Sequence, residues 1–156
     1  MDVATMPSTS SLLPRLQADF SQWKFESGEH FTWSSNQQTI YFVDSGDPAY
    51  LLHEIAHALL GHSRYDRDID LIKLERDAWD TAVHKLAPKY DIEIDSSLVQ
   101  DNIDTYRDWL HARSLCPNCS SVGYQTKRSV YSCPVCSSTW RVNEARTCEL
   151  RRYKIT

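Results

Sequence analysis

Two cysteine pairs place the strongest constraint on how this chain can fold. Cys116-Pro-Asn-Cys119 and Cys133-Pro-Val-Cys136 share a C-P-x-C pattern, and 13 residues separate them. Four thiolates on two such turns can close a tetrahedral site around one structural zinc ion. A redox-active C-x-x-C pair would not need a duplicate at this distance. Because four sulfur ligands leave no open coordination position, this zinc would stabilise the fold and perform no chemistry.

The charge of the chain changes sign close to these cysteines. Residues 1–112 contain 9 Lys or Arg and 19 Asp or Glu residues, a net charge of −10, whereas residues 113–156 contain 8 and 2, a net charge of +6. A sharp change in composition predicts a boundary between two parts of a chain. We therefore predict a loose tail at residues 1–10, an acidic body at 11–113 and a small basic zinc-ribbon module at 114–156.

Several common classes of protein are excluded. The four glycines are isolated, so the chain has no glycine-rich phosphate-binding loop. No apolar run approaches the ~20 residues that a membrane-spanning helix needs. The first ten residues lack the basic and apolar regions of a secretory signal. The five cysteines therefore indicate metal ligands or free thiols in the cytoplasm, and not a disulfide framework.

Hydrophobic periodicity predicts an α+β chain. Asp47 can cap a helix over residues 48–61, since an aspartate side chain accepts hydrogen bonds from the first N–H groups. Pro14 would start the first helix, and Pro88 would end a helix that begins near residue 71. The other expected elements are a hairpin of strands at 31–34 and 39–43, a helix that begins at Asp95 or Ser96, and ribbon strands at 124–127, 130–132 and 139–142.

The helix predicted over residues 48–61 carries the motif His53-Glu54-Ile-Ala-His57. A spacing of four residues places both imidazoles on one helix face, where they can bind a single Zn²⁺. Glu54 is angled away from this face, so we expect it to act as the general base for a metal-bound water in peptide hydrolysis. The alternative is a chance match on an ordinary helix whose histidines are only packed.

A catalytic zinc needs a third protein ligand, and Glu75 is the preferred candidate. It lies in the apolar stripe of the next helix, between Ile72 and Trp79, where a carboxylate without a partner is costly. A zinc ion would be that partner, and a half-exposed salt bridge is the alternative. His62 is the second candidate, because it lies ~140° from the metal face of a continuing helix unless Gly61 bends the chain.

Two segments carry a family resemblance. Residues 53–62 read H-E-I-A-H-A-L-L-G-H and residues 75–78 read E-R-D-A. Together they resemble the signature of the ImmA/IrrE-type zinc metallopeptidases, in which the glutamate at the position of Glu75 binds the metal. Asp77 and Trp79 depart from the family pattern, which has a glutamate and then an acid or amide at these positions.

The resemblance implies a compact zincin-like metallopeptidase domain, with a small mixed sheet and three or four helices, followed by the zinc ribbon with its four cysteine ligands. The edge strand of that sheet, at residues 39–43, would hold an extended substrate peptide. The implied substrate is a helix-turn-helix transcriptional repressor of a phage, mobile-element, stress or defence operon. The domain order is similar to that of the CapP-type proteases of anti-phage CBASS operons. An SprT-like protease of DNA-bound proteins is an alternative, although His62 follows Gly61 where that family has its third histidine before a glycine.

Sequence spacing cannot rank the remaining polar candidates. An oxyanion donor is needed for peptide hydrolysis, and Tyr65, His84, Tyr106 and His111 are the candidates. His62 is expected beside the ligands or at the end of its helix. Cys148, the fifth cysteine, is expected to be a small buried side chain, or alternatively a removable fourth ligand of the catalytic zinc, which would make it a regulatory thiol.

The basic module interleaves cations with aromatic residues, a pattern that suits single-stranded DNA or RNA. Alternatively, the aromatic residues form its core and its arginines dock on the acidic body. Bound nucleic acid would compete with the body and so regulate the protease. A further alternative is a nucleic-acid-binding ribbon on a non-catalytic zincin scaffold. The candidate contacts are Lys127, Arg128, Arg141, Arg146, Arg151, Arg152 and Lys154.

Overall fold

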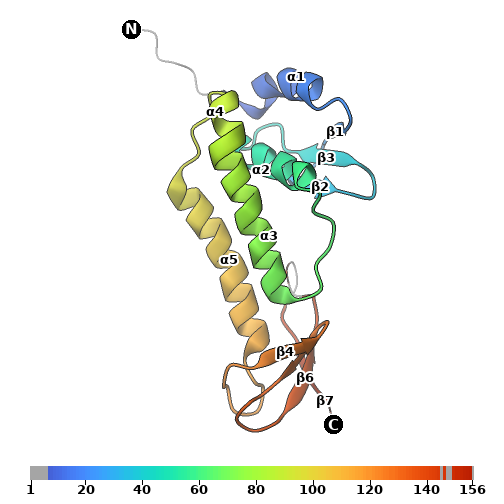
Figure 1. Cartoon of the computed structure of the whole chain (residues 1–156), viewed down its shortest axis with the longest axis vertical. Helices are drawn as coiled ribbons and strands as arrows, with labels where there is room; N and C mark the ends of the chain where they lie inside the picture. The colour runs from blue at the N-terminus through green and yellow to red at the C-terminus, as the bar shows by residue number, and fades with distance from the viewer. Residues whose placement is uncertain (1–6, 145, 147–148, 156) are drawn as a thin grey trace. The chain divides into compact units, whose positions relative to one another are not determined.

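The structure, a computed structural model, describes residues 7–144, 146 and 149–155 (Figure 1). The chain divides into two compact units, one formed by residues 1–63 and 76–99 and the other by residues 64–75 and 100–156. Each unit combines helix with a small sheet, so the predicted mixed α+β class is confirmed. The division passes through two long helices. The second unit therefore contains more of the chain than the predicted module at 114–156.

The first unit contains a three-stranded sheet in the order β1-β3-β2. Its strands are β1 (Lys24–Ser27), β2 (Thr32–Ser34) and β3 (Thr39–Phe42). β2 and β3 form the predicted antiparallel hairpin, whereas β1, which was not predicted, runs parallel to β3. β1 and β2 thus occupy both sides of β3. The family expectation that residues 39–43 form an edge strand is therefore wrong, and in this sheet β1 and β2 are the edges.

Helix α1 (Thr9–Asp19) begins earlier than predicted. The hydroxyl of Ser8 accepts a hydrogen bond from the N–H of Ser11, and the Ser11 hydroxyl accepts one from the N–H of Ser8. This reciprocal cap pairs backbone N–H groups at the start of the helix, upstream of Pro14. The proline therefore lies inside the helix and does not start it. The prediction of a loose tail at residues 1–10 is therefore wrong for Ser8 and the two residues that follow it. Residues 1–6 lie outside the described part of the chain.

Helix α2 (Pro48–Leu59) starts where the sequence predicted, because local signals define its first turn. The carboxylate of Asp47 accepts a hydrogen bond from the N–H of Ala49 at 2.9 Å. Pro48 occupies the first helical position, where its missing N–H costs nothing. Gly61 then adopts a φ of +70°, the left-handed conformation that glycine favours just after a helix, so the helix does not continue to residue 61 as predicted.

The next predicted helix is longer and less regular than expected. Helix α3 (Asp68–Thr81) leads into a π-helical turn, η1 (Ala82–Leu86), and a short helix, α4 (Ala87–Lys89). Pro88 lies within α4, so the prediction that it ends the helix is wrong. In a regular helix a proline ring collides with the carbonyl group four residues earlier. The wider π turn includes that position, His84, which explains how the helical path continues.

Helix α5 (Ser96–Ser114), most of which belongs to the second unit, is capped as predicted, since Asp95 accepts hydrogen bonds from the N–H and hydroxyl of Ser97. An antiparallel sheet follows in the order β4-β5-β6-β7. The first three of these strands coincide with the three predicted ones, and the fourth was not predicted. Their bounds are β4 (Tyr124–Lys127), β5 (Val130–Ser132), β6 (Thr139–Val142) and β7 (Arg152–Ile155).

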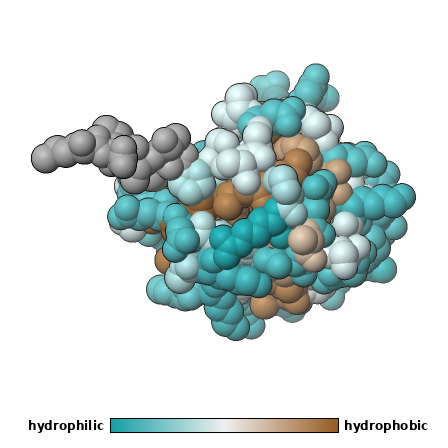
Figure 2. Space-filling view, turned by 90° about the horizontal axis from the view of Figure 1, so that it is seen from above, coloured by the Kyte–Doolittle hydropathy of each residue, from teal (hydrophilic) through white to brown (hydrophobic). Residues whose placement is uncertain are grey.

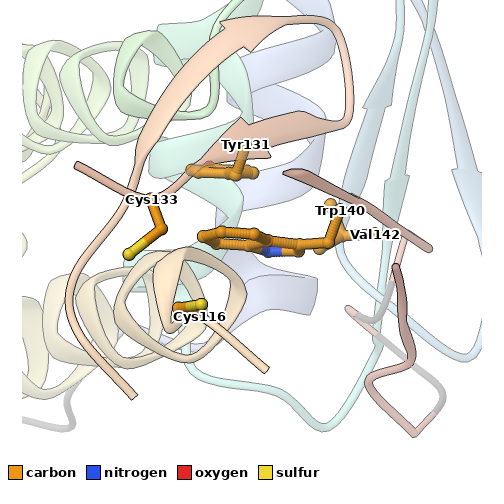
Figure 3. Packing of buried hydrophobic residues seen from close by; sticks show 5 residues of the cluster. All are labelled: Cys116, Tyr131, Cys133, Trp140 and Val142. Carbon is orange, nitrogen blue, oxygen red and sulfur yellow. The ribbon is translucent and has the colours of Figure 1, made fainter. Parts of the chain in front are cut away.

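The core of this sheet is built on two stacked aromatic rings (Figure 3). The ring centroids of Tyr131 and Trp140 lie 5.9 Å apart, with an angle of 15° between their planes. Cys116, Cys133 and Val142 are buried with them. The alternative interpretation of the module's aromatic residues, as core residues, therefore holds for Tyr131 and Trp140.

Hydrophobic residues are also found at the surface. The face shown in Figure 2 is mostly hydrophilic, with hydrophobic residues gathered toward its middle. The most exposed large hydrophobic side chain among the described residues is Val135, at 70%, in the turn of the second cysteine pair. No helix in the described part of the chain combines the length and apolar character needed to cross a membrane.

Candidate metal centres

The two motif histidines and Glu75 form a group that can hold one metal ion. His53 and His57 lie one turn apart on α2, with ring centroids separated by 4.5 Å, and Glu75 lies on α3. One donor atom of each residue lies within 4.8 Å of the other two. Glu75 is only 5% exposed, so it is not the half-exposed salt-bridge residue of the alternative interpretation. The structure thus brings together the three residues predicted as ligands of one metal ion.

The ring of His53 is held flat against Trp79. The two ring centroids lie 4.1 Å apart and the planes differ by 9°. Trp79 is fully buried on the apolar stripe of α3, one turn after Glu75. Nε2 of His53 and Oε2 of Glu75 are both inaccessible to solvent. Trp79 therefore supports the orientation of the first histidine through its ring face.

Glu54 lies beside this group but is not part of it. Its Oε2 accepts a hydrogen bond from the backbone N–H of Trp33 on β2, at 2.8 Å. Its Oε1 lies 3.5 Å from Nδ1 of His53. The carboxylate is therefore tied to the edge strand β2, with one oxygen held by the backbone and the other close to the first histidine.

His62 lies next to the second histidine of the motif. Its Nδ1 is 2.9 Å from Nδ1 of His57, and the ring centroids are 5.1 Å apart. The chain therefore bends at Gly61, and His62 does not lie on the far side of a continuing helix. The three-residue group does not include His62.

The four oxyanion candidates are divided between the two units, with His84 in the first and the other three in the second. His84 is exposed in the π turn. Burial, and next the charge of Asp68, raise the pKa of Tyr65. The guanidinium of Arg146 lies 3.6 Å from the ring centroid of Tyr106. His111 accepts a hydrogen bond from a serine hydroxyl through its backbone carbonyl. The role of oxyanion donor stays a prediction for all four residues.

The four paired cysteines form a second group, in which one sulfur of each lies within 4.8 Å of the others. None of them is in a disulfide. The sulfurs of Cys116 and Cys136 are 3.6 Å apart, and those of Cys119 and Cys133 are 3.5 Å apart. A hydrogen bond with the Ser138 side chain, the largest of several causes, lowers the pKa of Cys136 to about 5. A thiol with such a pKa is present largely as thiolate, the form that binds metals.

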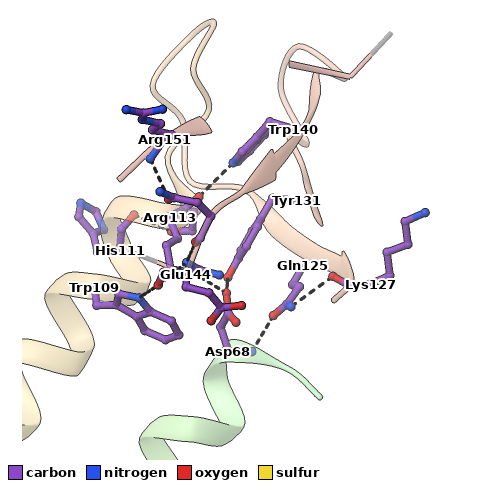
Figure 4. Close-up of polar contacts among 12 residues, drawn as sticks. Asp68, Trp109, His111, Arg113, Gln125, Lys127, Tyr131, Trp140, Glu144 and Arg151 are labelled. Carbon is purple, nitrogen blue, oxygen red and sulfur yellow. Dashed lines mark hydrogen bonds and ion pairs between the residues drawn. The ribbon is translucent and has the colours of Figure 1, made fainter. Parts of the chain in front are cut away.

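A buried ion pair joins the start of α3 to the end of α5, and a hydrogen bond extends it to the sheet β4–β7 (Figure 4). Oδ2 of Asp68 accepts hydrogen bonds from Nε of Arg113 at 2.9 Å and from the Tyr131 hydroxyl at 2.5 Å. The N–H of Asp68 donates to the side chain of Gln125 at 2.8 Å. Burial, followed by the bond to Asp68, raises the pKa of Tyr131. Sequence reasoning missed this network, since residues from four separate elements, α3, α5, β4 and β5, meet in it.

The basic candidates are placed on the second unit. Strand register puts Tyr124, Arg141, Tyr153 and Ile155 on one face of the sheet, because paired and alternate residues share a face. The guanidinium of Arg141 lies 4.6 Å from the ring centroid of Tyr153. The two tyrosines are 55% and 41% exposed. Also exposed are Lys127, Arg128, Arg146, Arg151, Arg152 and Lys154.

Arg152 and Cys148 are the last two predicted residues. The guanidinium of Arg152 donates a hydrogen bond to the carbonyl of Leu115 at 2.7 Å, so one of the predicted nucleic-acid contacts also has a structural partner. Cys148 lies outside the described residues, and its predicted roles are untested.

Comparison with known proteins finds no match to this chain: no family model, no curated protein and no solved structure matches it.

Proposed function

We propose that this protein is a zinc-dependent endopeptidase with a zincin-like body, acting in the reducing cytoplasm. The observation that carries the proposal is the convergence of His53, His57 and Glu75, with Glu54 beside them. Two imidazole nitrogens and one carboxylate oxygen are a donor set typical of catalytic zinc sites, which keep one position open. The four cysteines supply a different set, typical of a closed structural zinc site.

The donor sets support zinc over other common metals. Calcium and magnesium prefer sites made of oxygen donors alone, whereas the cysteine group has only sulfur donors and the His/His/Glu group has a single carboxylate oxygen beside two nitrogens. In the His/His/Glu group, zinc would be held by side chains that are nearly inaccessible to solvent. We therefore propose two zinc ions in each chain, one in each group.

In the proposed reaction, Glu54 is the catalytic residue that moves protons. Bound zinc supplies Lewis acidity, which polarises the peptide carbonyl and makes water a stronger acid. The Trp33 N–H holds Oε2 of Glu54 at 2.8 Å, which leaves Oε1 to take a proton from the attacking water and pass it to the leaving amine. The glutamate can do this only while its carboxylate is ionised and oriented, and the bond from β2 provides the orientation.

We propose that the substrate is a protein segment that binds in an extended form along β2. This strand is an edge of its sheet, and its residue Trp33 contacts Glu54 directly. An edge strand can pair its backbone with an added peptide, which would bring a scissile bond past the carboxylate. The substrate class that the motif resemblance suggests is a helix-turn-helix repressor.

Three purified variants and the wild type test this proposal. Glu54→Gln should retain two zinc ions and lose peptide cleavage, because an amide cannot take the proton. Glu75→Ala should retain one zinc and lose cleavage, whereas Asp77→Ala, an exposed acid on the same helix, should change neither. Zinc is measured by elemental mass spectrometry. Cleavage is measured on a proteome-derived peptide library and on any helix-turn-helix protein encoded beside the gene. Cleavage by Glu54→Gln at the wild-type rate would contradict the proposal.

A second candidate function, binding of single-stranded nucleic acid, is favoured by the sheet face that carries Tyr124 and Tyr153. Both rings are partly exposed, Arg141 stacks on the second, and the residues around them carry net positive charge. Bases can stack on such rings while cations bind the phosphates. We propose that this binding regulates the protease.

The nucleic-acid proposal has its own test. Fluorescence anisotropy with a labelled single-stranded oligonucleotide should show binding that weakens steeply as salt rises. Tyr124→Ala should weaken binding at every salt concentration, whereas Arg151→Glu should also make the salt dependence shallower. An oligonucleotide that binds both variants as well as the wild type would contradict a role for this face.

A further inference from the structure

The contact between His57 and His62 determines which nitrogen of His57 can face a metal. The two Nδ1 atoms are 2.9 Å apart, a distance at which one must donate a hydrogen bond and the other must accept it. A nitrogen engaged in this bond does not also bind a metal ion. The geometry therefore leaves Nε2 as the ligating nitrogen of His57, with the proton on Nδ1 donated to His62.

The end of α2 brings His62 back to His57. The N–H of Gly61 bonds to the carbonyl of Ala58 at 3.1 Å, and the N–H of His62 bonds to the carbonyl of His57 at 3.0 Å. This pair of bonds is the Schellman arrangement, which needs a left-handed residue at Gly61. A Cβ atom at Gly61 would meet nothing within 4 Å, so the glycine is required for its backbone conformation and not for space. His62 thus contacts His57 through both backbone and side chain.

Trp33 fixes the other side of His62. Its indole Nε1–H donates to the His62 carbonyl at 3.1 Å, while its backbone N–H donates to Oε2 of Glu54 at 2.8 Å. One residue of β2 therefore holds both the glutamate and the loop that carries His62. Both bonds lie within the first unit.

We propose that His62 is a positioning residue, which holds His57 in the tautomer with its proton on Nδ1 so that Nε2 binds the metal. The proposal rests on the proposed function in one respect, namely that His53, His57 and Glu75 bind zinc. Partners of this kind orient a ligating imidazole and increase its basicity, and their loss typically weakens metal binding by about 10–100-fold. Trp33 supports His62 by holding its carbonyl, which limits the directions in which the imidazole can point.

The test measures zinc affinity by competition with a chelator, on full-length protein that retains its cysteine-bound zinc. His62→Ala should weaken the second zinc by about 10–100-fold. His62→Asn should recover most of this loss, because Oδ1 of asparagine takes the place of Nδ1 and can accept the same hydrogen bond. His62→Gln should not, because its amide reaches the position of Nε2. His30→Ala, which removes an exposed histidine of the same unit, should leave the affinity unchanged.

Trp33→Phe provides an independent readout, because it removes the indole N–H and keeps the backbone N–H that binds Glu54. It should weaken zinc binding by less than His62→Ala does, and the two losses should not add, since they act through one contact.

Equal zinc affinity in wild type and His62→Ala would overturn the positioning role while leaving the proposed function intact. A loss of zinc affinity in His62→Ala as large as that in His53→Ala would show that His62 is itself a ligand, and this result would also overturn the positioning role. A wild-type protein with only one zinc would overturn the proposed function instead.

Discussion

The two candidate metal centres differ in how far apart their ligands lie in the sequence. The four cysteines come from two turns within residues 116–136, and all belong to one unit. The His/His/Glu group draws two residues from α2 and one from α3, with a loop between them. Turns place nearby ligands through local geometry alone, whereas two helices must pack correctly to place distant ones. The first kind of site can therefore be identified from spacing, and the second only from a pattern of burial.

The two centres also differ in their surroundings. Cys116 and Cys133 form part of the hydrophobic core with Tyr131 and Trp140. The histidine group is instead bordered by groups that can move protons, Glu54 and His62. A site whose ligands are core residues is suited to stability, and a site bordered by titratable groups is suited to chemistry. Three substitutions test this contrast.

The largest effect is expected for Cys116→Ser. Structural zinc sites of this kind contribute about 10–16 kcal/mol of apparent binding free energy to folding. The variant should therefore lose the sheet of the second unit, while the sheet of the first unit remains folded. Two-dimensional amide NMR can follow both, since signals of β4–β6 would lose dispersion and those of β1–β3 would keep it. Val135→Ala, in the other cysteine turn, should leave both sets unchanged, and collapse of both sheets in Cys116→Ser would contradict the contrast.

A smaller effect is expected for Asp68→Ala, which asks whether the four-cysteine sheet is stable by itself. The substitution leaves the buried Arg113 without its carboxylate and the Tyr131 hydroxyl without its acceptor. Breaking a buried pair in this way typically costs about 3–5 kcal/mol. Urea denaturation of zinc-loaded protein should show this loss for Asp68→Ala and almost none for Asp70→Ala, an exposed acid on the same helix. Equal stability of the two variants would mean that the cysteine-bound zinc stabilises the sheet without help from the ion pair.

The smallest effect is expected for Asp47→Ala, at the start of the helix that carries the histidines. Loss of a helix cap typically costs about 1 kcal/mol, which corresponds to a fall of about 2–4 °C in the melting temperature for a chain of this length. Asp47→Asn keeps a side-chain acceptor and should melt close to the wild type. Differential scanning calorimetry measures both. A fall as large as that of Asp68→Ala would show that the histidine helix depends on its first turn far more than we expect.

Elements with local signals could be predicted from the sequence. Asp47 and Pro48 defined the start of α2, and the alternation of aromatic and β-branched residues defined β2 and β3. The burial of Glu75 followed from its place in an apolar stripe, and the structure confirms it. Each of these features depends on residues within one or two turns, which is the range over which spacing carries information.

Elements that depend on distant partners could not be predicted. β1 and β7 consist mostly of exposed residues and show no alternation, so only pairing with β3 and β6 makes them strands. For the same reason β3 was wrongly expected at an edge. His62 was expected beside the ligands or at the end of its helix, and the left-handed conformation of Gly61 brings it next to His57. The serine cap of α1 was a local signal that could have been found.

The contacts at the end of α5 also limit how this protein can change by recombination. Arg113 donates to the backbone carbonyls of Asn143 and Glu144, and its own carbonyl accepts the indole N–H of Trp140 at 3.0 Å. A genetic crossover between residues 113 and 114 would keep the arginine and exchange all three of these partners. The last turn of the helix must therefore be inherited together with the cysteine-bearing sheet, and a descendant with a different C-terminal module would need its junction upstream of Arg113.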